Sequence, residues 1–161
     1  METRGQRVFR IDDDLKNLIE SGVAVVIGTT DAARKPNVNY CWGPRVLNSR
    51  HSLHLFLECS RATPTRENLE QTGAVAITVA DPITYRSVQL KGRHITTEPA
   101  TDEDLAWVQR HREAFSSATA LTGDSPGVRR NAWMEDALLR FEVEISAAFD
   151  QTPGPNAGRP L

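Results

Sequence analysis

Apolar and polar residues alternate with a period of two along several short stretches of this chain, a pattern that indicates half-buried β-strands. Residues 75–79 are one example, with Val, Ile and Val on the same face. The same pattern predicts strands over residues 52–59, 85–96 and 140–145, and the continuous apolar run 23–27 predicts a strand covered on both faces. Short turn segments separate most of these strands. We therefore expect antiparallel strands, joined by hairpins, that close into a barrel.

Residues 37–42 divide into two faces in the same way. Val38, Tyr40 and Trp42 alternate with two asparagines and a cysteine. The alternation predicts one strand with a buried apolar face and an opposite polar face. Gly43–Pro44 predicts that this strand bends or stops there.

Two helices are predicted in the first half of the chain. Three acidic residues at 12–14, followed by apolar positions within 15–19, predict an N-terminal helix that Gly22 ends. Residues 65–71 predict a polar helix of two turns, closed by Gly73.

Two further helices are predicted after residue 99. Residues 101–121 begin with acidic residues and then carry apolar side chains at helical spacing. Ser125–Pro126 predict the start of the next helix, with Trp133, Ala137 and Leu138 on its inner face.

The composition fits one globular domain. The chain has 161 residues, of which 39% are hydrophobic and 25% charged, and a net charge of −2. We expect a single domain over residues 1–150, followed by a tail, 151–161, rich in proline and glycine. The composition of the tail alone favours disorder, but we expect it to be ordered as an extended turn over the barrel mouth or the partner subunit. The small charge favours no nucleic-acid partner. The chain has no apolar run of about 20 residues and no signal-peptide pattern, so we expect no membrane partner and a cytoplasmic location.

Cysteine and histidine spacing predicts no metal site. Cys41 and Cys59 lie in predicted strands without a zinc-binding spacing, so we expect reduced thiols. His111 interrupts the apolar stripe of a predicted helix and is expected to be a packed or rim residue. No Ser/His/Asp or Cys/His arrangement is evident, so no side chain is assigned a catalytic role.

Residues 65–79, a short polar helix leading into a buried strand, are followed by the strand segment Tyr85–Gly92. This arrangement resembles the pyridoxamine 5'-phosphate oxidase-like superfamily of FMN-binding split β-barrels, from about residue 18 to residue 92 and again in the last strand. The resemblance implies a mainly β fold, a split β-barrel with peripheral helices, that holds FMN at the subunit interface of a homodimer. Three tryptophans, more than one small core needs, also favour a homodimer.

The resemblance also implies an oxidoreductase that transfers hydride or electrons between a reduced donor and a small-molecule substrate. The chain has no C-terminal arginine–histidine substrate motif of the oxidase itself. The resemblance is therefore to the wider superfamily and not to that reaction.

Segment 60–66 concentrates phosphate-binding groups just ahead of a predicted helix: Arg61, Thr63, Thr65 and Arg66. Guanidinium forks, hydroxyls and the amides of a helix N-terminus all favour anionic oxygen. The resemblance implies that these four residues hold the FMN phosphate. The residues alone leave another interpretation open, in which Thr63 or Thr65 caps the helix and the arginines are solvated.

Ser87, Gln89 and Lys91 share one face of their predicted strand, opposite Val88 and Leu90. The resemblance implies that this face contacts the flavin ring or its ribityl chain. The alternative is an ordinary exposed strand face.

Two positions depart from the superfamily pattern. Thr65 stands where the superfamily has a lysine, and Asn39 stands where it has a phosphate-binding arginine, which leaves Asn39 a place near the ribityl chain. Three functions stay open: an FMN flavoprotein, a flavin-free barrel that binds another ligand or a partner, and a haem- or deazaflavin-binding relative.

Overall fold

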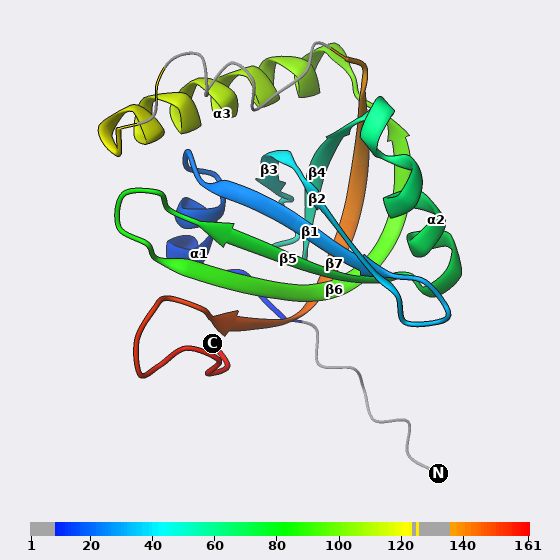
Figure 1. Cartoon of the computed structure of the whole chain (residues 1–161), viewed down its shortest axis with the longest axis horizontal. Coiled ribbons are helices and arrows are strands. Elements are labelled where there is room, and N and C mark those ends of the chain that lie inside the picture. Colours follow the sequence, from blue (N-terminus) through cyan, green and yellow to red (C-terminus); the bar gives the residue numbers. More distant parts are fainter. Residues whose placement is uncertain (1–8, 124, 126–135) are drawn as a thin grey trace.

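The computed structural model describes residues 9–123, 125 and 136–161 and is mainly β (Figure 1). Within these ranges, seven antiparallel strands form one sheet in the order β2-β1-β5-β6-β7-β4-β3. The strands are β1 (Ala24–Thr30), β2 (Pro36–Tyr40), β3 (Trp42–Val46), β4 (Ser52–Glu58), β5 (Ala74–Ala80), β6 (Ser87–Pro99) and β7 (Leu138–Asp150). The helices are α1 (Asp13–Ile19), the 3-10 helix η1 (Cys59–Arg61), α2 (Thr63–Thr72) and α3 (Asp102–Leu121).

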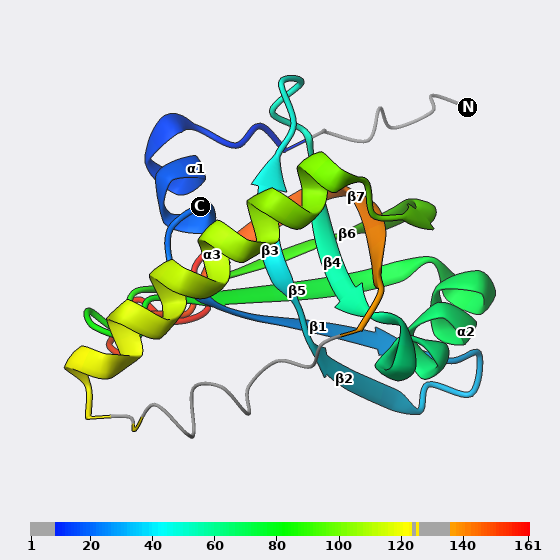
Figure 2. The same cartoon turned by 90° about the horizontal axis from the view of Figure 1, so that it is seen from above.

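A single residue, Cys41, connects the two edge strands of the sheet. β2 and β3 lie at opposite ends of the strand order but follow each other in the chain. The Cys41 amide donates to the carbonyl oxygen of Val25 at 3.0 Å. The sheet therefore curls until its edges meet, and Figure 2 shows α3 lying across β3 while α2 lies by β1 and β2. This is the split β-barrel that the sequence predicts.

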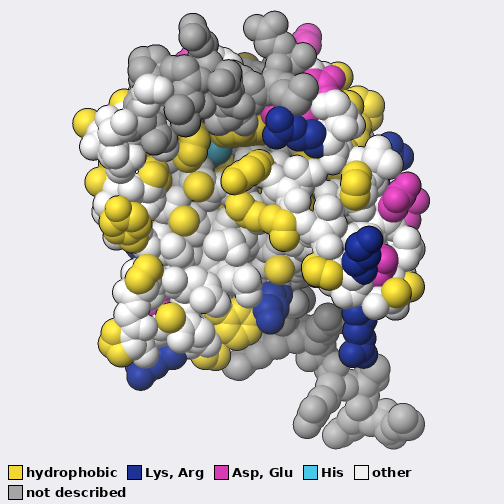
Figure 3. Space-filling view, in the orientation of Figure 1, with side chains coloured by type: hydrophobic (Ala, Val, Ile, Leu, Met, Phe, Trp, Pro, Cys, Tyr) yellow, Lys and Arg dark blue, Asp and Glu magenta, His cyan; other side chains and the backbone are white. Residues whose placement is uncertain are grey.

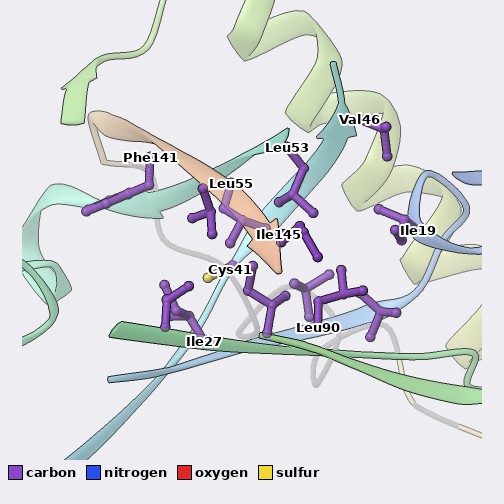
Figure 4. Close-up of a cluster of buried hydrophobic side chains, with 14 of the residues drawn as sticks. Ile19, Ile27, Cys41, Val46, Leu53, Leu55, Leu90, Phe141 and Ile145 are labelled. Carbon is purple, nitrogen blue, oxygen red and sulfur yellow. The ribbon is translucent and has the colours of Figure 1, made fainter. Parts of the chain in front are cut away.

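The barrel interior is a continuous apolar core. The register places Ile27 opposite Ile77, and Ile77 opposite Leu90, and all three side chains are fully buried. Figure 4 shows Ile27, Leu90 and Ile145 directed into this interior. Removing each such side chain from water contributes about 1.5–3 kcal/mol. A slip of one residue would turn these side chains outward, so the core fixes the register.

The prediction for residues 37–42 is wrong about which face is buried. Val38 and Tyr40 are 68% and 60% exposed. Asn37 and Asn39 instead turn toward α2 and η1 and form hydrogen bonds there. The alternation breaks at Cys41, between β2 and β3. The amide side chains find partners on the inner side, and this decides the orientation of β2.

Gly43 and Pro44 lie within β3 and do not end it. The pairing of β3 with β4 is irregular between Trp42 and Arg45, so of the two predicted outcomes the structure shows a bend and not a stop. Gly43 has a φ of +54°, and a Cβ at this position would lie 2.8 Å from Cγ2 of Val108 on α3. At Gly22, a Cβ would lie 2.6 Å from the backbone carbon of Ala114. Both glycines allow α3 to lie directly against the barrel.

The first two helices are present, but each has one shifted end. α1 ends at Ile19 with Glu20 as its C-cap, so Gly22 does not end it as predicted. Asp12 caps α1, because its Oδ1 accepts from the Leu15 amide at 2.8 Å. α2 begins at Thr63, two residues earlier than predicted. It ends at Gly73, which has a φ of 65° and donates its amide to the carbonyl oxygen of Leu69.

α3 begins with a capping box between Thr101 and Asp104 and ends at Leu121, as predicted. The helix predicted to follow it, including Trp133, lies outside the described residues except at its two ends. There Ala137 is not helical, and Leu138 begins β7, because its backbone pairs with β4.

The tail, residues 151–161, turns back along the end of β7. The Asp150 amide donates to the carbonyl oxygen of Arg159 at 2.9 Å, and the Leu161 amide donates to that of Ala148 at 3.0 Å. The tail therefore packs beside the barrel, near the lower edge in Figure 1. Among the described residues, no helix combines the length and apolarity that crossing a membrane requires.

Candidate functional site

The outer face of the sheet carries a row of residues across four strands. Val38 of β2 lies opposite Gly28 of β1, Gly28 opposite Ala76 of β5, and Ala76 opposite Lys91 of β6. Directly opposed residues of an antiparallel ladder project to the same side of the sheet. The row therefore has a floor of small residues, an apolar wall at Val38 and a cationic wall at Lys91.

These residues line a hollow of about 320 Å³, which we call the outer trough. Figure 3 shows this side of the molecule, where apolar side chains spread across the surface and basic ones stand among them. The lining residues are Gly28, Thr29, Thr30, Pro36, Asn37, Val38, Ala74, Val75, Ala76 and Lys91. Its volume is at the lower end of the range for small-molecule sites.

Gly28 is not required by its own backbone conformation. Its φ is not positive, and a Cβ there would have the carbonyl oxygen of Ala76, at 3.8 Å, as its close neighbour. The space above Gly28 is therefore open on the outer side. A glycine inside a strand often marks a place where a ligand or another backbone approaches closely.

The sequence-predicted residues of β6 lie on this outer face. Lys91 lines the trough, and Arg93 stands beside it on the same face, opposite Ala74. Gln89 lies one row away, between Thr78 and Phe149.

Ser87 lies farther along β6, beyond the trough, and its hydroxyl donates to the carbonyl oxygen of Tyr85 at 2.9 Å. Its hydroxyl proton is therefore already used within the β5–β6 loop. Of the three predicted β6 residues, Lys91 is the one that lines the trough.

The residues around α2 have other partners. Thr65 is fully buried, and its Oγ1 accepts from Asn37 Nδ2 at 3.2 Å. Asn39 Nδ2 donates to the carbonyl oxygen of Arg61 at 2.7 Å. At the two positions that depart from the superfamily pattern, the side chains thus fasten α2 and η1 to β2.

Arg61, Thr63 and Arg66 remain available to an anion at the start of α2. Thr63 and Arg66 are exposed and Arg61 is half-buried. The N-cap of α2 is Ala62, which provides no side-chain cap, so neither threonine caps the helix as one interpretation proposed.

The structure therefore divides the eight predicted residues between two places. Asn39, Arg61, Thr63, Thr65 and Arg66 lie around α2, and Ser87, Gln89 and Lys91 lie on the outer face of β6. Asn37 belongs to both places, since it binds Thr65 and lines the trough. The floor residues Gly28 and Ala76 could not be predicted from the sequence, because they become neighbours only through strand register.

The histidines and acidic residues form no metal centre in the described part of the chain. None of the four histidines lines the trough, and no cluster of three or more His, Cys, Asp or Glu side chains is placed to hold a metal ion. His111 is buried between α3 and the barrel, and this burial lowers its pKa to about 4.

Comparison with solved structures identifies the fold. HupZ from Group A Streptococcus matches with a TM-score of 0.56 and 17% identity, over 92% of this chain and 99% of that one. An F420 reductase matches with a TM-score of 0.53 and 18% identity, over 83% and 94%. A protein from Lactobacillus delbrueckii, provisionally named as a pyridoxamine 5'-phosphate oxidase, matches with 0.52 and 19%, over 87% and 93%.

No family model and no curated protein matches the chain. At these identities the structural matches define the architecture. The chain shares the split β-barrel fold of these solved structures.

Proposed function

We propose that this chain is an FMN-binding split-barrel protein, a homodimer that holds flavin between its subunits and acts as an oxidoreductase on a small molecule. The outer trough is the observation that supports this function best. Its floor of Gly28 and Ala76 carries only small residues, which leaves room for an aromatic ring system, and Lys91 supplies positive charge at one wall. When bound there, the flavin would supply the hydride or electron chemistry.

The chain's own residues would position the flavin. Gln89, one row from the trough, offers an amide that can donate to or accept from the polar edge of the ring. Lys91 favours electron density near its ammonium group. Val38 covers the opposite wall and would limit access of water.

The exposed apolar residues of β2 support the homodimer. Val38 and Tyr40 project from the outer face and are mostly exposed in one chain. A second copy on this face would cover them, and a specific dimer is expected to bury above about 1,000 Å². The same contact would bring the α2 group of one subunit toward the β6 group of the other.

The phosphate would then lie at the start of α2. Thr63 and Arg66 are exposed there, and Arg61 precedes them in η1. Thr65 and Asn39 would support the site by holding α2 and η1 in place.

Flavin titration of a filled trough tests this function. In Gly28→Val, a branched side chain occupies the floor, and its Cβ would be in ordinary contact with the Ala76 carbonyl oxygen at 3.8 Å, so we expect FMN and riboflavin both to bind at least about tenfold more weakly. Thr78→Val, on the same face but outside the trough lining, is the matched control and should bind as the wild type does. Unchanged FMN binding by Gly28→Val would refute the trough as the flavin site.

The two cationic residues on one wall favour a deazaflavin as the second candidate. Lys91 and Arg93 follow each other on the outer face. A deazaflavin whose anionic chain is longer than that of FMN could pair with both side chains. Titration of Arg93→Ala with FMN and with the deazaflavin separates the two, because only the longer chain should lose affinity. A wild-type protein that binds neither would support the flavin-free alternative.

A further inference from the structure

A second hollow lies on the other side of Lys91, toward the end of the chain. It measures about 360 Å³, and we call it the tail pocket. Its lining residues are Phe9, Arg10, Ser146, Ala147, Ala148, Phe149, Pro160 and Leu161. None of these residues was predicted from the sequence to bind a ligand.

Three separate segments build the tail pocket, and hydrogen bonds hold each in place. The Phe9 amide donates to the carbonyl oxygen of Ile145 at 3.3 Å, which fixes the N-terminal wall. The Leu161 amide donates to the carbonyl oxygen of Ala148, and Pro160 forms a bridge with Phe149, which fixes the tail wall. The pocket is therefore a built feature of the fold.

The chemistry of the lining is aromatic on two sides and positive at one point. Phe9 and Phe149 provide the aromatic surfaces, and Arg10 provides a guanidinium group. No Asp or Glu is present among the described residues that line the pocket. The Ser146 hydroxyl also lines the pocket, and it already donates its proton to the carbonyl oxygen of Lys91 at 3.1 Å.

We propose that the tail pocket binds a small aromatic carboxylate, with the ring against Phe149 and the carboxylate at Arg10. A guanidinium group pairs with a carboxylate through two parallel hydrogen bonds. Aromatic faces give such a ligand large contact area and a preferred orientation. A hollow of this volume suits a ligand of one or two rings.

Lys91 connects the tail pocket to the outer trough. It lines the trough, and its Nζ lies 5.1 Å from the centre of the Phe149 ring. A ligand against Phe149 would therefore be separated from the trough by one side chain.

Binding of 2-naphthoate and of its uncharged counterpart 2-naphthamide, followed by saturation-transfer NMR and calorimetry, tests the pocket. Arg10→Gln should weaken naphthoate about tenfold or more and leave naphthamide unchanged. Phe149→Leu keeps the apolar volume and should weaken both. Arg110→Gln, on α3 and away from the tail in Figure 1, is the charge-matched control and should change neither. Circular dichroism checks that the variants fold.

The outcomes separate this pocket from the flavin proposal. Gly28→Val should lose FMN but keep naphthoate. If the wild type binds naphthoate and no flavin, the tail pocket stands while the proposed flavin function fails. Three results would overturn the proposal for the tail pocket. The wild type does not bind naphthoate, it binds naphthoate no better than naphthamide, or Arg10→Gln leaves the affinity for naphthoate unchanged.

Discussion

His111 on α3 donates from Nε2 to the carbonyl oxygen of Val23, 3.0 Å away, just ahead of β1. Its other nitrogen, Nδ1, accepts from the Gly43 amide at 3.1 Å. This pair of bonds requires the neutral imidazole with its proton on Nε2. One side chain thus connects α3 to both β1 and β3, and it can do so only while it is uncharged.

The first prediction is that folding stability falls as pH decreases below the ordinary pKa of histidine. Burial is the main cause that lowers the pKa of His111, from 6.5 to about 4. Between these values the unfolded chain binds a proton that the folded chain does not, so stability is fully present above pH 6.5 and declines toward pH 4. The loss should reach about 3 kcal/mol.

Chemical denaturation at pH 7, 5.5 and 4.5 measures this effect. Other groups also titrate in this range, so the decisive quantity is the difference between the wild type and His111→Gln. The variant should be less stable at pH 7 and lose less on acidification. Parallel pH profiles for the two proteins would show that His111 does not titrate as we expect.

The second prediction concerns the buried pair Glu58 and Arg112. Glu58 Oε1 accepts from Arg112 at 3.1 Å and from Trp42 Nε1 at 2.8 Å, and Glu58 is 1% exposed. Arg112→Leu leaves the carboxylate in an apolar cluster and should cost about 3–5 kcal/mol.

A double-mutant cycle is the measurement for this pair. Adding Glu58→Gln to Arg112→Leu removes the charge but keeps an oxygen for Trp42, so part of the lost stability should return. If the two substitutions simply add, no coupling exists between these charges.

The third prediction concerns backbone strain at Tyr85. This residue has a φ of 61° and is mostly exposed, so its conformation is unfavourable and little burial compensates. Tyr85→Asn should stabilise the fold by about 1 kcal/mol, because asparagine tolerates this region. Thermal unfolding measures the gain. Ile83→Asn, on the same loop without a positive φ, should bring none.

The sequence predicts the elements whose pattern reflects the core. Residues 75–79 form β5 because their apolar residues face the barrel interior, and the α1 and α3 caps follow from local hydrogen bonding. The orientation of β2 could not be predicted in this way. The alternation of its residues is compatible with burial of either the Val38 face or the Asn37 face. The deciding contact is with Thr65 on α2, which strand periodicity does not contain.

The pattern of apolar and polar residues also does not predict the outer trough. Ala74 and Ala76 occupy the non-core face of β5, and nothing local distinguishes them from ordinary exposed positions. Their neighbour Gly28 is 46 to 48 residues away in the chain and joins them through pairing of β1 with β5. By contrast, the groups around Arg66 that are predicted to bind phosphate are close together in the sequence and can be recognised there.

The fourth prediction concerns the phosphate. Arg66→Ala should remove a charge-assisted hydrogen bond worth about 1.5–3 kcal/mol, a loss of roughly ten- to over a hundredfold in FMN affinity. Riboflavin has no phosphate and should bind as before. Fluorescence titration with both flavins measures this. Equal weakening of both would mean that Arg66 acts through folding.

The fifth prediction tests whether the flavin site uses both subunits. Arg66 lies on α2 and Lys91 on the outer face of β6, so in the proposed dimer they would come from different chains. Arg66→Ala and Lys91→Ala homodimers should each bind FMN weakly. Chains of the two variants, unfolded together and refolded in equal amounts, should regain tight binding at about a quarter of the wild-type sites, because random pairing gives half mixed dimers with one intact site each.

Light scattering must first show dimers in all samples, and a monomer mass at micromolar concentration would contradict the assembly itself. A mixture that stays as weak as the two parents would mean that each chain holds its flavin with its own Arg66 and Lys91. If the Arg66→Ala or the Lys91→Ala homodimer alone binds FMN tightly, the residue substituted in that homodimer is not part of the flavin site. Tight FMN binding returns upon mixing only if each flavin site is built from both subunits. In a mixed dimer, both substitutions then lie in one site and the other site is intact.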